Sequence, residues 1–369
     1  MLLLIRGLRA KGWDVALMLL HCEGVRLDQA RADGIAIFDV RLPRMRPRWN
    51  PLPWFQLPFT LARSVKFIRA WKPDVIHAWL FWAHLWARIA LMFLPRIAFI
   101  TSRRQTVHAG PLTRIESWVN RRADAVVANS NAVAESILKL EKNLPRRRFV
   151  IHHGIDLGAI AGLRIANLRS EFPALAGAAQ VAVIVANLLP AKGYPDLLRA
   201  WKVVADKHAD ARLLCVGADG GLGRELVQLC GKLGLEKHVI FAGARTDAVS
   251  LIEGADLCVL SSRDEGLSNS MLEYMACGKP MVITAVSGAR EAVAHEETGF
   301  IVPPQNPKAL AAAINALIED PVMAARLGSN ARERALEVFD KGKMIRAYER
   351  LYRSADLRIG AAIPASGDE

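Results

Sequence analysis

The chain has 369 residues, of which 52% are hydrophobic, and a formal net charge of +13 at pH 7. A chain of this length and hydrophobicity can bury a large core, and it usually forms two domains. Its five cysteines are odd in number and include no CxxC pair. This pattern indicates neither a disulfide framework nor a zinc site, and a reduced, cytoplasmic compartment fits best.

The apolar stretches of the first hundred residues are too short or too interrupted for a signal peptide or a membrane span. The first of them is followed at once by Arg6 and Arg9. Residues 78–100 are rich in apolar side chains, but His84 and Arg88 interrupt them, and a span needs about 20 mostly apolar residues. We expect a buried helix and strand there.

Apolar runs of strand length alternate with helix-like stretches along most of the chain, which predicts parallel sheets with crossover helices. The predicted strands are Val15–Leu20, Val75–Ala78, Ala98–Thr101, Ala125–Ala128, Phe149–Ile151, Val181–Ala186, Arg212–Val216, Val239–Ala242, Leu257–Leu260 and Met281–Ile283.

Residues 157–180 carry Ala, Gly and a Pro without strong periodicity, and we interpret them as a linker between two domains. The predicted domains are residues 1–160 and 175–338. Residues 339–369 are predicted to form a last helix, which crosses back to the first domain, and a tail.

The positive charge lies in the first half of the chain. Up to position 165 there are 26 basic and 11 acidic residues, against 23 and 25 in the remainder. Within residues 41–72 a run of arginines is followed by aromatic residues, namely Arg41, Arg44, Arg46 and Arg48, then Trp49, Trp54, Phe55 and Phe59. This stretch is interpreted either as a surface for anionic lipid headgroups or as a solvated loop. No recognition motif for nucleic acid accompanies the charge.

Two carboxylates and a helix start occur close together in residues 265–280. Glu265 and Glu273 are eight positions apart, and the Ser and Asn residues before Met271 suit a helix N-terminus. Gly278 and the following proline end that helix. Its free backbone N–H groups and its dipole predict a binding site for an anion such as a diphosphate. A carboxylate beside that anion site is expected to contact neutral hydroxyls, because it would repel the phosphates.

This stretch resembles the signature of the retaining family 4 glycosyltransferases, also called glycosyl transferases group 1. The matching residues, in order, are Glu265-Gly266, Glu273, Ala276-Cys277-Gly278, Pro280-Met281-Val282, Ser287-Gly288, Glu291, Thr298-Gly299-Phe300 and Val302-Pro303-Pro304. The resemblance runs over most of residues 70–355. It implies an α/β fold with two doubly wound, Rossmann-like domains facing a cleft, which is the GT-B architecture.

The resemblance also implies an activity. The chain would transfer a hexose, with retention, from a nucleoside diphosphate sugar to the hydroxyl of a lipid-linked, glycan or small-molecule acceptor. Such an enzyme needs no metal ion and no cofactor, because the nucleotide sugar is the donor substrate. A cytoplasmic or peripheral membrane enzyme of polysaccharide or lipopolysaccharide biosynthesis is the expected context. The alternative hypothesis is a catalytically weak nucleotide-sugar-binding or partner subunit of a glycan assembly system.

By the same resemblance, the loop after the first strand of the second domain holds the donor diphosphate. Lys192 falls where the family places a base that stabilises the leaving group. Asn187 stands where the family usually has Arg, so one positive charge is missing unless Arg245 or Arg263 replaces it.

The resemblance assigns the remaining donor contacts to the segment that carries Glu265 and Glu273 and to a glycine-rich turn. Glu273 is assigned the ribose hydroxyls, and Glu265 the donor sugar or the reacting face. The other expected contacts are Gly217, Gly220 and Arg245 near the nucleobase, Gly266, Leu267, Ser268 and Asn269 near the diphosphate or sugar, and Ser287, Gly288 and Glu291 near the donor.

In the first domain, histidines are the candidates for the acceptor side. His77 ends a predicted strand, and His108 lies near the place where relatives carry a histidine facing the sugar. Relatives begin with a strand and a glycine-rich loop, whereas here Met1 already falls in the first helix. We therefore expect that first strand and loop to be missing. His153 replaces an Asn of the family pattern, and no metal role is expected for it.

Overall fold

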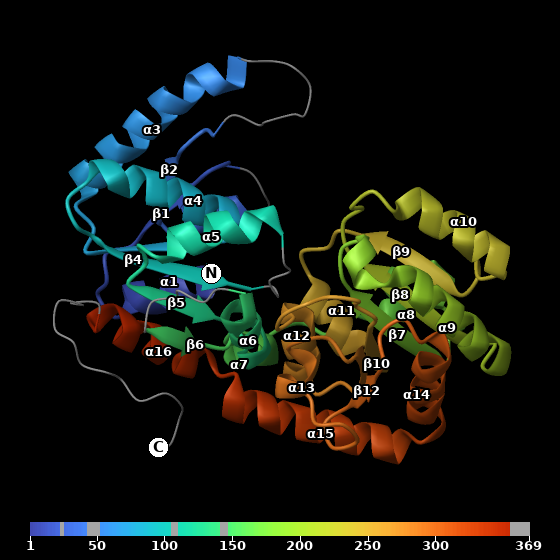
Figure 1. The fold of residues 1–369 in the computed structure, drawn as a ribbon. Coiled ribbons are helices and arrows are strands. Elements are labelled where there is room, and N and C mark those ends of the chain that lie inside the picture. The colour runs from blue at the N-terminus through green and yellow to red at the C-terminus, as the bar shows by residue number, and fades with distance from the viewer. Residues whose placement is uncertain (23–25, 43–51, 105–109, 141–146, 355–369) are drawn as a thin grey trace. The chain divides into compact units, whose positions relative to one another are not determined.

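The computed structural model describes residues 1–22, 26–42, 52–104, 110–140 and 147–354. Within these ranges the chain divides into two compact α/β units (Figure 1). Unit 1 contains Met1–Asn129, Ala134–Ile151 and the segment from Lys341 on, and unit 2 contains Ser130–Val133 and His152–Asp340.

Unit 1 is built on parallel strands that the described residues arrange as two sheets, β1-β2 and β3-β4-β5-β6. Its strands are β1 Ala16–Leu19, β2 Ala36–Asp39, β3 Val75–Trp79, β4 Ala98–Arg103, β5 Ala125–Ala128 and β6 Arg148–Val150. Its helices are α1 Leu2–Ala10, α2 Arg26–Ala32, α3 Leu52–Trp71, α4 Phe81–Ala90, the 3-10 turn η1 Leu91–Phe93, α5 Pro111–Asn120, most of α6 Asn131–Leu140, and α16 Lys341–Arg353.

The last helix packs against the first one. Gly7 of α1 faces the Ile345 side chain of α16 so closely that a Cβ atom at position 7 would lie 2.2 Å from the Ile345 Cδ1. Lys11 forms an ion pair with Glu349 beside this contact. Helix α16 thus belongs to unit 1 and lies against α1.

Unit 2 is built on one six-stranded parallel sheet in the order β12-β11-β10-β7-β8-β9. Its strands are β7 Gln180–Val185, β8 Ala211–Val216, β9 Val239–Gly243, β10 Leu257–Leu260, β11 Met281–Thr284 and β12 Phe300–Val302. The chain runs outward from β7 to β9 and then returns to the other side of β7 with β10. This is the doubly wound strand order, and its switch point lies between β7 and β10.

Helices cover both faces of this sheet (Figure 1). They are α7 Leu157–Ala161, α8 Leu168–Glu171, the 3-10 turns η2 Pro173–Leu175 and η3 Pro190–Lys192, α9 Tyr194–Lys207, α10 Gly223–Leu233, α11 Ala248–Gly254, α12 Asn269–Ala276, α13 Ala289–Ala292, α14 Pro307–Glu319 and α15 Pro321–Val338. Successive side chains of β7 point to opposite faces of the sheet. Ala182 and Ile184 pack in the core with α9 and α14, whereas Val181 and Val183 pack with α8 and α11.

Every strand predicted from the sequence is present, with its ends within two residues of the predicted ones. The strands β2 and β12 were not predicted. The interpretation of residues 157–180 as a linker is wrong, because α7, α8 and η2 lie there and Leu168 and Leu175 are fully buried in unit 2. These short helices have little periodicity, yet their apolar side chains cover one face of the sheet.

None of the helices that the structure describes has the length and hydropathy needed to cross a membrane. Residues 81–103 form α4, η1 and β4, as expected, and His84 and Trp86 of α4 are buried.

Candidate functional site

Some of the predicted donor residues line one cavity of unit 2, which has a volume of about 310 Å³. It lies at the carboxyl ends of β7 and β8 and at the start of α12, beside the switch point of the sheet. Its lining residues are Val185, Ala186, Asn187, Lys192, Val216, Gly217, Ala218, Ala244, Arg245, Ala248, Glu265, Ser268, Asn269 and Ser270.

The end of β7 is fixed by three side chains from the helices on either side. The buried Tyr194 of α9 donates its hydroxyl to the Ala186 carbonyl oxygen at 2.5 Å. The Tyr274 hydroxyl of α12 accepts from the Val185 amide at 2.8 Å, and the Ser270 hydroxyl donates to the Val185 carbonyl at 2.6 Å. These bonds hold the first turn of α12 against the strand end. Sequence reasoning did not find the two tyrosines, because a Tyr within an apolar stretch carries no signal of the carbonyl that it faces.

The first turn of α12 presents backbone donors to the cavity. Ser268 is the N-cap residue, and its side chain makes no capping hydrogen bond. The first N–H groups of a helix have no partner within the helix, and the helix dipole adds partial positive charge. Ser268, Asn269 and Ser270 line the cavity at this place. The arrangement suits an anion, as the sequence indicated.

Lys192 and Glu265 meet at the same end of the cavity. The Lys192 Nζ lies 2.5 Å from Oε1 of Glu265, and both side chains are largely buried, with exposed fractions of 20% and 18%. The other carboxylate oxygen of Glu265 accepts from the Ser262 hydroxyl at 2.8 Å. The backbone after Lys192 is fixed too, because Gly193 has φ +66° and a Cβ there would lie 2.0 Å from the Ser261 carbonyl oxygen.

The structure distinguishes the two arginines that could replace the missing base. Arg263 makes a double contact with Asp196, at 2.9 and 2.8 Å, and does not line the cavity. Arg245 does line it, and its guanidinium is held by Asp247 at 2.8 and 2.7 Å. Hydrogen bonding to Asp247 raises the pKa of Arg245 above its ordinary value. Among the described residues that line the cavity, the basic side chains are therefore those of Lys192 and Arg245.

Asn187 and Gly217 shape the side of the cavity formed by the β7 and β8 loops. The Asn187 Oδ1 accepts from the Ala218 amide at 3.0 Å, so Asn187 joins the two loops. A Cβ at Gly217 would lie 2.0 Å from the Ala186 carbonyl oxygen. Gly220 is similarly close to Leu188 and Leu189.

Several predicted residues do not line the cavity. The side chain of Leu267 is buried in the core, and Gly266 contacts Gly288 closely at the backbone, since a Cβ on Gly288 would lie 2.6 Å from the Gly266 oxygen. Glu273 is half-buried in the middle of α12. Gly220 also lies outside the lining, and His108 lies outside the described residues.

Glu291 has a different environment from the one expected near the donor. Its carboxylate accepts from the Asn131 and Ala132 amides at 2.8 and 2.9 Å and lies 3.1 Å from the His152 Nε2. Burial alone would raise the pKa of Glu291, but the hydrogen bonds from His152 and from these amides hold it below its ordinary value. Glu291 thus caps the start of α6.

His77, the other histidine candidate, lies in β3 and is held on both ring nitrogens. Its Nδ1 lies 2.6 Å from the Tyr352 hydroxyl of α16, and its Nε2 lies 2.6 Å from the Ser102 hydroxyl. Burial, with the nearby charges of His84 and Arg104, lowers its pKa to about 3. The ring is therefore neutral near pH 7.

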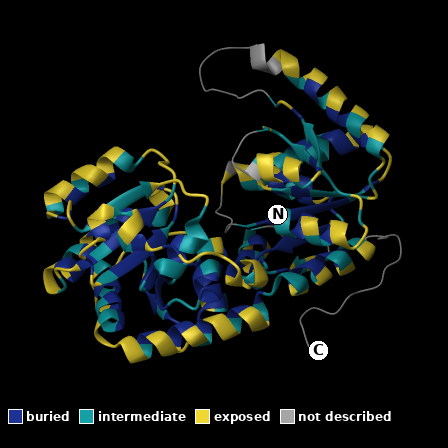
Figure 2. Ribbon diagram, turned by 180° about the vertical axis from the view of Figure 1, so that it is seen from behind, coloured by how far each residue is buried: buried dark blue, intermediate teal, exposed yellow. Residues whose placement is uncertain are grey.

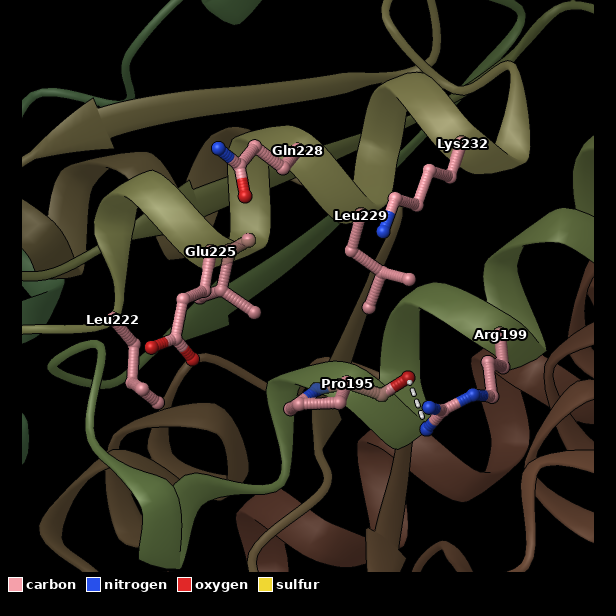
Figure 3. Close-up of a pocket in the computed structure, with 8 residues that line it drawn as sticks. Pro195, Arg199, Leu222, Glu225, Gln228, Leu229 and Lys232 are labelled. Atoms are coloured by element: carbon pink, nitrogen blue, oxygen red, sulfur yellow. Dashed lines mark hydrogen bonds between the residues drawn. The ribbon is translucent and has the colours of Figure 1, made fainter.

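A second hollow, of about 340 Å³, lies between α9 and α10 (Figure 3). Pro195, Leu222 and Leu229 supply its apolar wall, and Figure 3 shows the charged ends of Glu225 and Lys232 beside it. It is lined by none of the predicted site residues. The cavity at β7, β8 and α12 is therefore the candidate site.

Comparison with known proteins gives the family. The profile of the glycosyl transferases group 1 matches residues 170–334, and that of glycosyltransferase family 4 matches residues 1–159. The chain belongs to this glycosyltransferase family. The chain is 28% identical over 233 residues to N-acetyl-alpha-D-glucosaminyl L-malate synthase of Bacillus anthracis, covering 63% of this chain and 60% of the relative. It is 31% identical over 262 residues to D-inositol 3-phosphate glycosyltransferase of Kineococcus radiotolerans, covering 65% and 59%. The matched part thus spans about three fifths of these two relatives.

Solved structures extend the likeness over nearly the whole chain. Anabaena Alr3699/HepE in complex with UDP-glucose has a TM-score of 0.82 at 25% identity, covering 96% of this chain and 94% of that chain. Sucrose-phosphate synthase from Thermosynechococcus elongatus has a TM-score of 0.78 at 21% identity, covering 96% and 92%. Both the family and the expected fold of two Rossmann-like domains, the GT-B architecture, are confirmed.

Proposed function

We propose that this glycosyltransferase moves a hexose, with retention, from a nucleoside diphosphate sugar to an acceptor hydroxyl on a lipid-linked, glycan or small-molecule acceptor. The observation that carries the proposal is the position of the Lys192 ammonium beside Glu265 at the N-terminus of α12, within one cavity. A UDP-sugar is the first donor to test, because the similar Alr3699/HepE has been solved with UDP-glucose.

In this proposal Lys192 and the first amides of α12 bind the diphosphate and stabilise the negative charge that grows on it as the glycosidic bond breaks. The acceptor oxygen bonds to the anomeric carbon on the face that the diphosphate leaves. The configuration is retained because the new bond forms on the face that the leaving group occupied, and the acceptor proton passes to a phosphate oxygen of that leaving group. Preorganised donors of this kind typically contribute about 10²- to 10³-fold to the rate.

The carboxylates have separate roles. Glu265 faces the cavity and contacts donor sugar hydroxyls, while Glu273, which lies on α12 outside the lining residues, is assigned the ribose hydroxyls by the family resemblance. Gly217 and Arg245 line the cavity and border the nucleobase, and Gly220, outside the lining, is assigned to the same contact by the resemblance. His108 is assigned to the acceptor side.

The positive charge at the diphosphate comes from Lys192 and the helix, so catalysis requires no bound metal ion. Among the cavity's lining residues Glu265 supplies the carboxylate, and it is already paired with Lys192. Activity should therefore persist in EDTA. A loss of activity that Mg²⁺ or Mn²⁺ restores would contradict this part of the proposal.

Calorimetric titration with UDP, GDP and ADP tests the donor site. We expect one nucleotide to bind, and Lys192→Ala and Glu273→Ala each to weaken its binding at least about tenfold, as the loss of a charged contact does. Lys308→Ala, at an exposed position of α14, is the matched control and should bind normally.

Two results would contradict the proposal. One is a folded protein that binds none of the three nucleotides. The other is nucleotide binding without transfer to any acceptor and without slow hydrolysis of the donor, which would favour a nucleotide-sugar-binding subunit.

A further inference from the structure

Helix α3 of unit 1 has an unusual distribution of side chains between its two faces. Phe55 and Phe59 are 72% and 76% exposed, whereas Thr60 and Ser64 are 6% and 0% exposed. A surface helix of a globular protein normally buries its large apolar residues, as α3 does with Val65 and Ile68, which are 8% and 5% exposed, so the two exposed phenylalanines depart from that pattern. Figure 2 shows the exposed positions running along this helix.

The inward face of α3 is fixed to unit 1 by specific contacts. The Trp86 Nε1 of α4 donates to the Ser64 hydroxyl at 3.1 Å. Phe67 stacks on Phe38 of β2, with ring centroids 4.3 Å apart. Since these contacts determine which face points inward, the exposure of the phenylalanines follows from the packing of the helix.

The outward face continues from aromatic to basic residues. Phe55, Phe59, Lys66 and Arg69 follow one another at helical spacing, and we call them the α3 stripe. All four residues are exposed, and the whole helix contains no acidic residue. Residues 51–100 contain six basic residues and one acidic residue.

The apolar surface extends beside the basic end of the α3 stripe. The Arg69 Nη2 donates to the Phe93 carbonyl at 2.9 Å, which brings η1 against α3. Met92 and Phe93 of η1 are 60% and 54% exposed. Large exposed side chains on two adjoining elements, combined with positive charge, indicate an interaction surface rather than scattered surface residues.

We infer that the α3 stripe, with Met92 and Phe93, docks unit 1 on an anionic phospholipid surface. The helix would lie along the interface, with its phenylalanine rings among the acyl chains and Lys66 and Arg69 at the lipid phosphates. The absence of acidic residues from α3 supports this partner, because an acidic residue would be repelled. The described helices are too short or too polar to span a membrane, so this contact is a peripheral one.

Vesicle flotation of the full chain tests the inference, using phosphatidylcholine vesicles with and without phosphatidylglycerol. We expect binding to the anionic vesicles that weakens as salt is added. Phe55→Ser combined with Phe59→Ser should lower the partition constant at least about tenfold, because two large apolar side chains no longer leave water. Lys66→Glu alone should lower it at least about fivefold.

Matched controls lie in unit 2. Val322→Ser removes a side chain that is 82% exposed on α15, and Lys308→Glu makes the same charge change on α14. Neither should change vesicle binding. UDP binding and far-UV circular dichroism, measured on every variant, show whether the fold and the donor site are intact.

Several outcomes would overturn the inference. One is a wild-type protein that does not bind anionic vesicles. Another is an equal partition constant for the wild type and the Phe55/Phe59 double variant. A third is binding of the wild type to uncharged vesicles that equals its binding to anionic ones. Dimerisation of the wild type that the double variant abolishes, without vesicle binding, would assign this surface to a second copy of the chain. UDP binding is measured separately, so failure of the donor site and failure of the docking surface can be told apart.

Discussion

Gly217 lies where the chain leaves β8, and its lack of a side chain lets the backbone of the β7 loop pass beside it. An alanine Cβ would come within 2.0 Å of the Ala186 oxygen and 2.5 Å of the Ala186 carbonyl carbon. We expect Gly217→Ala to lower the free energy of unfolding by about 1–3 kcal/mol, the usual cost of overpacking, and to weaken nucleotide binding by displacing the cavity wall. Chemical denaturation and calorimetric titration measure the two effects.

Gly177→Ala is the control for this prediction, because no atom lies within 4 Å of a Cβ built there. Its effect on stability should stay within about 0.5 kcal/mol, as is usual for surface substitutions. A Gly217→Ala protein that binds nucleotide normally would show that the β7 and β8 loops can separate without harm to the site.

Single residues also show the limit of sequence reasoning at this site. Lys192 and Glu265 were singled out through the family pattern, and both follow predicted strands, whose carboxyl ends meet at one edge of a parallel sheet. Arg245 and Arg263 could not be distinguished, since both are bases on strand-end loops. Asp196 of α9 decides between them, and its contact with Arg263 depends on packing that the local sequence does not encode.

At the scale of elements, β3, β4 and α16 enclose a histidine pair that should make unit 1 sensitive to acid. The pKa of His77 is about 3, lowered mainly by burial, and that of His84 is also about 3. An unfolded histidine has a pKa of about 6.5. Between these two pKa values the unfolded chain binds protons that the folded chain does not. The contribution of the neutral histidines to the free energy of unfolding is therefore fully present above about pH 6.5 and decreases as the pH falls towards 3.

His77→Gln should remove one of the two protons that the unfolded chain takes up and the folded chain does not. The slope of the free energy of unfolding against pH, measured by chemical denaturation below pH 6.5, should decrease by up to about 1.4 kcal/mol per pH unit. Tyr352→Phe is the control, because it deletes the hydroxyl at the His77 Nδ1 and keeps the titrating ring, so the slope should remain. Parallel profiles for wild type and His77→Gln would show that the proton binds elsewhere.

Two strands, β2 and β12, were not found from the sequence. β2 has four residues of intermediate burial and ends in Asp39, and β12 has three residues. Length alone does not explain the difference, because β6 also has three residues and was predicted. The strand conformation of β2 and β12 depends on pairing with β1 and β11, and the local residues do not encode that pairing.

For the whole molecule, the described residues that line the candidate cavity come from unit 2, so a donor nucleotide should stabilise the two units unequally. Unit 2 buries Trp201, Tyr194 and Tyr274 completely, while β1 and β2 of unit 1 keep mostly intermediate burial. We expect unit 1 to unfold first on heating. UDP at about 100 times its Kd adds about 2.7 kcal/mol to the state that binds it. The second transition should therefore rise by about 5–10 °C for a unit of this size, while the first stays in place.

Tryptophan fluorescence assigns the transitions, because eight of the nine tryptophans precede residue 130 and Trp201 lies in unit 2. Most of the fluorescence change should accompany the first transition, with scanning calorimetry recording both. Lys192→Ala should remove the shift of the second transition, and Lys308→Ala should retain it. A single transition that moves as a whole with UDP would mean that the two units unfold together, and the stability of unit 1 would then depend on the donor site of unit 2.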